Sequence, residues 1–179
     1  IVAFDLRVNQ SRAFYEGYLA IQEEDRKKPS LSPVRRRILK RVIMNAELTG
    51  VGLAPAERSR FNAIQNELAG LAADFRNNLL DATKAFSLLL TETEQVEGLP
   101  QSLLAVTEMS ARQEGLAQGR PSGTGPWKIT LDTAVYLPFM RHCRNRNVRE
   151  QLYRAHIARA STAPCDNTAL TERIIALRR

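Results

Sequence analysis

The sequence predicts a mostly α-helical fold that carries one small two-stranded β-ribbon. Apolar residues recur at intervals of three and four over much of the chain, which is the spacing of one face of a helix. Two short stretches have instead the apolar and β-branched composition of strands. Proline and glycine gather in four clusters that separate these segments, at residues 29–33, 50–55, 98–100 and 115–126.

A first helix is predicted at residues 32–49, between the first two clusters. Its apolar stripe consists of Val34, Ile38, Leu39, Val42, Ile43 and Ala46. Ser32 and Pro33 suit the N-cap and the first helical position, because the serine side chain accepts a free backbone N–H and proline lacks one. Gly50 suits the C-terminal stop.

The longest predicted helix covers residues 55–85. An approximate seven-residue repeat, which Asn78 interrupts, starts in it and consists of Phe61, Ile64, Leu68, Leu71, Phe75, Ala82, Phe86 and Leu89. Such a repeat favours packing on a near-antiparallel neighbour, and the helix at 32–49 is the obvious partner. We therefore expect a long antiparallel helical hairpin that buries Phe61, Leu68, Leu71 and Phe75.

The rest of the chain is predicted to contain both strands and four further helices. A strand at 86–91 and a strand at 127–131 are expected to pair across an intervening helix at 100–116. The later helices are expected at 134–143, 148–160 and 168–179. Together these elements predict a single helical lobe over residues 1–179.

The composition excludes several classes of protein. The chain has 179 residues, 26 Lys+Arg against 19 Asp+Glu, and two cysteines, too few for a disulfide scaffold. The longest purely aliphatic run is residues 88–90, whereas a membrane span needs about 20 apolar residues. The first residue is Ile1 and not Met, so any targeting peptide is expected upstream of this sequence.

Positive charge is concentrated at residues 26–41 and 141–159. The candidate contact residues for a polyanion or a partner protein are Arg35, Arg36, Arg37, Lys40 and Arg41. The alternative is an ordinary solvated helix face, which is favoured because no aromatic residues for base stacking are interleaved. Nucleic-acid binding is the weaker interpretation.

No catalytic or metal-ligating residue is predicted. His142 and His156 are fourteen residues apart, whereas a His-Glu-x-x-His zinc site needs two histidines one helical turn apart. A metal held by these histidines with Cys143 and Cys165, or a reactive Cys143 thiolate beside arginines, is a weaker alternative to structural roles. The glycine-rich stretch 119–125 lacks the ending of a phosphate-binding loop and is expected to be flexible.

Six stretches in register resemble the N-terminal half of the thimet oligopeptidase and oligopeptidase A family of zinc metallopeptidases, most closely its plant and green-algal branch. They are residues 75–86, 97–100, 125–132, 136–140, 149–154 and 159–161. The resemblance implies a two-lobed helical enzyme in which a zinc-activated water cuts short peptides in a deep cleft. The family's zinc ligands lie in the C-terminal half, so the resemblance implies zinc in the full-length family and no cofactor or catalytic residue in this chain.

Two functions follow from this resemblance. The chain is expected to be the N-terminal helical lobe of a zinc-dependent oligopeptidase, inactive by itself, with the catalytic half and short peptides as its partners. The alternative is a truncated, inactive chain that serves as a structural subunit of a larger organellar assembly. The expected location is the mitochondrion or chloroplast, or alternatively the cytoplasm. An isolated lobe should expose apolar residues that a partner covers, namely Leu152, Ile157, Ile174, Ile175 and Leu177.

Overall fold

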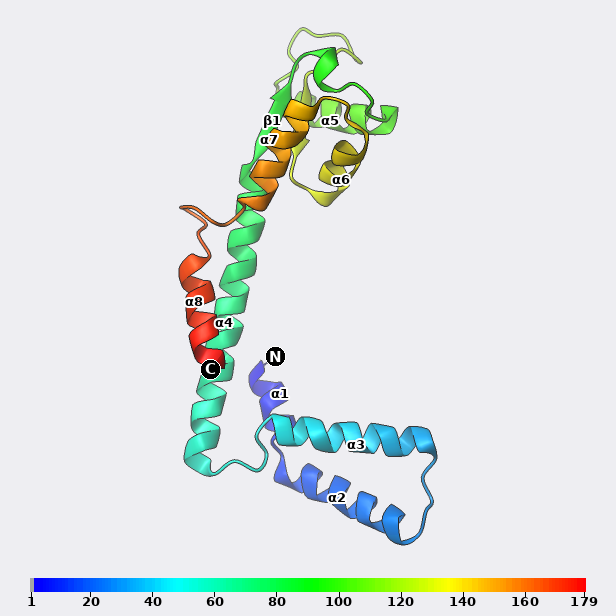
Figure 1. Ribbon diagram of the computed structural model, residues 1–179, viewed down its shortest axis with the longest axis vertical. Helices are drawn as coiled ribbons and strands as arrows, with labels where there is room; N and C mark the ends of the chain where they lie inside the picture. The colour runs from blue at the N-terminus through cyan, green and yellow to red at the C-terminus, as the bar shows by residue number, and fades with distance from the viewer. Residues whose placement is uncertain (1) are drawn as a thin grey trace. The chain divides into compact units, whose positions relative to one another are not determined.

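The computed structural model describes residues 2–179, with side chains from Phe4 onward, and confirms the mostly α-helical class (Figure 1). The elements are α1 (Val2–Asn9), α2 (Arg12–Lys27), α3 (Pro33–Leu48), α4 (Pro55–Ala85), β1 (Ser87–Leu90), the short 3-10 helix η1 (Thr93–Gln95), α5 (Gln101–Gln113), β2 (Trp127–Thr130), α6 (Thr133–His142), α7 (Arg146–Ile157) and α8 (Thr168–Arg178). No helix within residues 2–179 has the length and apolar character needed to cross a membrane.

The chain divides into two compact units. The first contains the residues up to Ala72 together with Ala176–Arg179, and the second is Ala73–Ile175. The prediction of a single helical lobe over residues 1–179 stays a prediction.

The first unit contains an antiparallel hairpin of α2 and α3 (Figure 1). Helix α3 begins as predicted: Pro33 occupies the first turn, and the Ser32 side chain accepts a hydrogen bond from the Arg35 N–H. Ile43 and Ala46 are its buried residues. Gly50 follows the helix with a φ of +87°, a conformation that glycine adopts without the steric cost of a side chain.

The predicted pairing of α3 with α4 is wrong, because the main neighbour of α3 is α2. The sequence prediction assigned no helix to residues 2–27. The residues of α2 that are at least half-buried recur at helical spacing, but most are polar or aromatic: Tyr15, Tyr18, Leu19, Gln22 and Asp25. A stripe of this composition gives a weak apolar periodicity.

Helix α4 has the predicted bounds, but none of its residues is buried. Phe61, Leu68, Leu71 and Phe75 are only half-buried, so the expected apolar seam is incomplete. Asn78 interrupts the seven-residue repeat because its side chain donates a hydrogen bond to Asn167 Oδ1 at 2.9 Å. Asn167 is buried and donates in turn to the Phe75 carbonyl at 3.1 Å.

The hydrophobic core lies in the second unit, around the β-ribbon. Strands β1 and β2 pair as predicted; their pairing is antiparallel, with Leu90 opposite Trp127 and Leu88 opposite Ile129. The buried residues of this core are Leu90, Val96, Leu99, Leu103, Trp127, Ile129, Leu131, Tyr136, Phe139, Cys143, Val148 and Leu152. Helices α5, α6 and α7 contribute to it.

Leu152 was expected to be exposed, and that prediction is wrong, because its side chain is 0% exposed in this core. It lies on the buried face of α7 with Val148, four residues earlier. Of the other residues expected to need cover, Ile157 and Ile175 are exposed, whereas Ile174 and Leu177 are half-buried.

We predict that Leu152→Ala lowers the stability of this chain by about 2–5 kcal/mol, because it removes buried methyl groups and leaves a cavity. The matched control is Leu80→Ala on α4, where the side chain is 50% exposed and a change within about 0.5 kcal/mol is expected. Chemical denaturation followed by circular dichroism measures both effects. Equal losses for the two variants would contradict the core described above.

Candidate functional site

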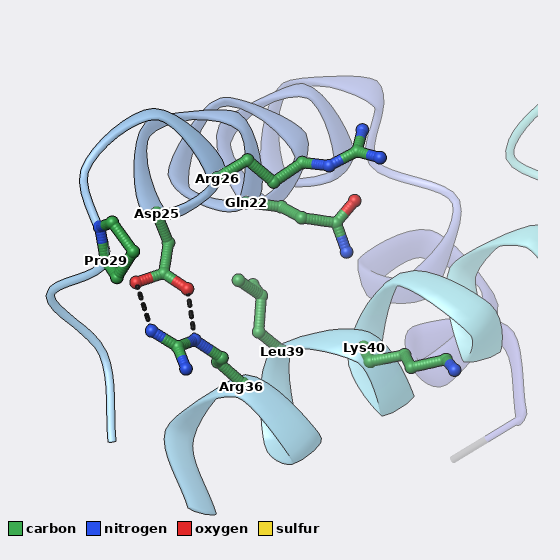
Figure 2. A pocket seen from close by; sticks show the side chains of 7 residues that line it. All are labelled: Gln22, Asp25, Arg26, Pro29, Arg36, Leu39 and Lys40. Carbon is green, nitrogen blue, oxygen red and sulfur yellow. Dashed lines mark hydrogen bonds and ion pairs between the residues drawn. The ribbon is translucent and has the colours of Figure 1, made fainter. Parts of the chain in front are cut away.

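A hollow of about 540 Å³ lies between α2 and α3, near the loop that joins them (Figure 2). Its lining residues are Gln22, Asp25, Arg26, Pro29, Arg36, Leu39 and Lys40. Five of these seven side chains are charged or polar, so the hollow offers groups that can bind a charged ligand.

Asp25 organises this hollow. Its side chain is buried and accepts hydrogen bonds from the backbone N–H groups of Ser30 and Leu31, both at 2.8 Å. The guanidinium of Arg36 donates to both carboxylate oxygens, through Nε to Oδ2 and through Nη2 to Oδ1. The Arg36 hydrogen bond, followed by the backbone donors, lowers the pKa of Asp25 far below its usual range.

The position of Asp25 has a local explanation. An acidic residue in the last turn of a helix is unfavourable, since the C-terminus carries the negative end of the helix dipole. Here the carboxylate accepts hydrogen bonds from two backbone N–H groups of the loop that follows α2. It also binds Arg36, which lies near the start of α3. Asp25 therefore joins both helices of the hairpin to their loop.

The structure separates the five basic residues named from the sequence. Arg36 and Lys40, four residues apart on α3, line the hollow together. Arg35 lines another groove, whereas Arg37 and Arg41 line neither and lie about 100° further around the helix. A polyanion surface over all five stays a prediction, but only two of them share this hollow.

Sequence reasoning missed Gln22, Asp25 and Arg26, which α2 contributes to the hollow. The signal that was available is an acid in the last turn of a helix, followed four residues later by Pro29. The side chain of Arg26 approaches Glu23 at 3.7 Å, but both groups are exposed and such a pair contributes little to stability.

An apolar groove of about 220 Å³ lies on another flank of the same hairpin. Its lining residues are Tyr18, Ile21, Leu31, Arg35, Ile38, Leu39 and Val42. The hairpin thus has one charged and one apolar flank, because residues spaced by three or four along each helix have similar character.

Three arginines of the second basic cluster lie on α7, and protein groups bind two of them. The Arg154 guanidinium contacts Glu150 at 2.8 Å, and Arg149 donates to the Cys143 carbonyl. A hollow of about 520 Å³ is lined there by Met140, Arg146, Arg149, Glu150, Tyr153, Arg154 and Ile157. Three arginines and Glu150 give it the same formal charge as the hairpin hollow, where three cations stand against Asp25.

The histidine and cysteine alternatives lose their support. The ring of His156 stacks on Tyr136 with centroids 4.0 Å apart, and burial followed by the Arg159 charge lowers the pKa of His156. Burial raises the pKa of the Cys143 thiol, which favours a structural role for this side chain over a reactive thiolate. Within residues 2–179 no group of three His, Cys, Asp or Glu side chains is placed to hold a metal ion, and these residues do not fit a zinc site.

The glycine-rich loop that was expected to be flexible is tied to α5. Glu108, which is buried, accepts a hydrogen bond from the Gly123 N–H at 2.9 Å, and Arg112 donates to the Pro121 carbonyl at 2.8 Å. The hydrogen bond from Arg112, assisted by the one from Gly123, lowers the pKa of Glu108. These contacts anchor the loop to α5.

Comparison with known proteins relates the whole chain to oligopeptidases. Residues 1–58 match the family described as Neurolysin/Thimet oligopeptidase, N-terminal domain. The chain is 42% identical over 177 residues to the probable cytosolic oligopeptidase A of Arabidopsis thaliana. The aligned region covers 99% of this chain and 25% of that protein. It is equally 42% identical to the organellar oligopeptidase A, chloroplastic/mitochondrial, of the same plant, covering 22% of it.

A bacterial relative, the oligopeptidase A of Haemophilus influenzae, is 32% identical over 176 residues, which are 96% of this chain and 24% of that protein. The chain therefore spans about a quarter of the length of the curated relatives it matches, and not the half that the sequence resemblance suggested.

We predict that the Asp25 carboxyl titrates far below the usual Asp value of about 3.9. Because its pKa is lowered in the folded state, its contribution to hairpin stability is complete above that value and is lost as the pH falls below it. Carboxyl ¹³C chemical shifts measure this titration. Arg36→Gln should raise the Asp25 pKa, while Arg37→Gln should leave it in place; a normal Asp25 pKa in the unaltered chain would contradict the ion pair.

Proposed function

The chain belongs to the thimet oligopeptidase and oligopeptidase A family, and from this membership we propose that it forms the N-terminal helical part of a zinc-dependent oligopeptidase that degrades short peptides. The observation that carries the proposal is the 42% identity to two plant oligopeptidases A over 99% of the chain. The mostly helical fold is consistent with this role.

We assign the chemistry to a further segment of the same protein. A catalytic zinc needs three protein ligands and an open fourth position for water. The described residues offer no such set, as shown above. The role that we propose for residues 1–179 is therefore architectural: their helices form part of the wall that admits short peptides to the catalytic segment and excludes folded proteins.

The proposed location is the mitochondrion or chloroplast, with the cytoplasm as the alternative. Support for the first comes from the relative named as organellar, and support for the second from the relative named as cytosolic. Both relatives are 42% identical to this chain, so identity does not rank one above the other.

A second candidate function is a structural subunit without catalytic activity. The observation that favours it is the number of large apolar side chains at the surface, including Phe14, Val34, Ile38, Ile157 and Ile175. Scattered apolar residues are common on protein surfaces, but two of the exposed ones, Ile21 and Ile38, line the apolar groove of the hairpin. A partner chain in an assembly could cover these apolar side chains, and so could a further segment of a peptidase.

We predict that the isolated 179-residue chain neither hydrolyses a quenched fluorescent peptide nor retains stoichiometric zinc after dialysis. The native polypeptide that contains this sequence should cleave the same peptide and lose that activity with a zinc chelator. Fluorescence assays and elemental analysis measure both properties. Chelator-sensitive turnover by the isolated chain would place catalytic residues within it. That result would contradict the proposal that the catalytic residues lie in a further segment.

A further inference from the structure

We propose that the hollow between α2 and α3 is a binding site for an oxyanion, a phosphate or carboxylate group carried by a larger molecule. Two pairs of residues at i and i+4 face this hollow, Gln22 and Arg26 from α2 and Arg36 and Lys40 from α3 (Figure 2). The inference goes beyond the proposed peptidase role and does not depend on it.

The charge balance of the hollow favours an anion. Asp25 is the only acidic residue in its lining, and Arg36 with two backbone N–H groups already satisfies that carboxylate. Among the described residues, the side chains of Gln22 and Lys40 make no hydrogen bond or ion pair with protein groups, and the side chain of Arg26 has only its exposed contact with Glu23. A guanidinium, an ammonium and an amide therefore remain to bind oxygen atoms.

The Asp25 ion pair also holds the Arg36 guanidinium in a fixed orientation in which it can bind an oxyanion. The carboxylate takes the Nε and Nη2 donors, which leaves Nη1 among the described residues without a partner. The Arg36 side chain is 46% exposed, so the guanidinium is fixed on one edge and accessible from outside. A donor that is already held in place loses less conformational entropy when a ligand binds.

The dimensions of the hollow indicate how the oxyanion is presented. About 540 Å³ is within the range of small-molecule sites and much larger than a single phosphate, so the anion is one group of a larger ligand. Arg37 and Arg41 do not line the hollow, which favours one anionic group over the extended backbone of a nucleic acid. A phosphorylated small molecule and an acidic peptide side chain share this chemistry.

The test uses the full 179-residue chain at constant ionic strength, since salt screens exposed charges. Backbone amide spectra are followed during titration with inorganic phosphate, with a blocked glutamate-containing peptide, and with the same peptide carrying glutamine. Lys40→Gln and Arg26→Gln remove one cation from the hollow. The matched controls are Arg41→Gln and Lys27→Gln. Each removes the cation that follows Lys40 or Arg26 in the sequence and does not line the hollow.

We expect saturable shifts at residues 22–40 with phosphate, with the glutamate peptide, or with both, and this pattern identifies the source of the oxyanion. Lys40→Gln and Arg26→Gln should each weaken that binding about fivefold or more, as loss of a charged hydrogen bond does. The control variants should change it less than about twofold. No saturable binding, equal binding of the glutamine peptide, or equal effects of Lys40→Gln and Arg41→Gln in folded variants would overturn the proposal.

Discussion

Buried polar side chains bind connecting loops of this chain to the neighbouring helices, and the placement of the helices depends on these hydrogen bonds. Among residues 4–179, the buried polar residues are Asp25, Thr107, Glu108 and Asn167. Three of these bind a connecting segment: Asp25 holds the loop after α2, Glu108 holds Gly123, and Asn167 joins the start of α8 to α4. A buried carboxylate or amide must be hydrogen-bonded to avoid a large desolvation cost, so each of these loops has one favourable conformation.

The same constraint explains the chemistry of the hairpin hollow. Because Asp25 is fully occupied by the loop and by Arg36, it does not neutralise Arg26 or Lys40. The hollow therefore keeps positive charge beside a rigid ion pair. In the second unit, Glu150 pairs with Arg154 and Arg149 is bound to a carbonyl, so protein groups bind two of the three arginines on α7.

The sequence predicted the local elements well because their signals are local. The bounds of α4, the capping of α3 by Ser32 and the presence of two short strands follow from residues that are neighbours in the chain. The choice of helix partner is not local. Helix α2 was missed because Tyr15, Gln22 and Asp25 occupy its inner stripe, and α4 was then paired with α3 in its place. The hollow needs both helices, so Arg36 and Lys40 were named without Asp25, Gln22 or Arg26.

We propose that these residues are one part of a longer oligopeptidase whose catalytic residues lie elsewhere in the same polypeptide. The mass of the native polypeptide, captured with an antibody against this sequence and measured intact, tests it most directly. The chain has a mass of 20.1 kDa and covers 25% of an Arabidopsis oligopeptidase A, so the account predicts about four times the mass of this chain. A native polypeptide close to 20.1 kDa would contradict the account and favour the structural subunit.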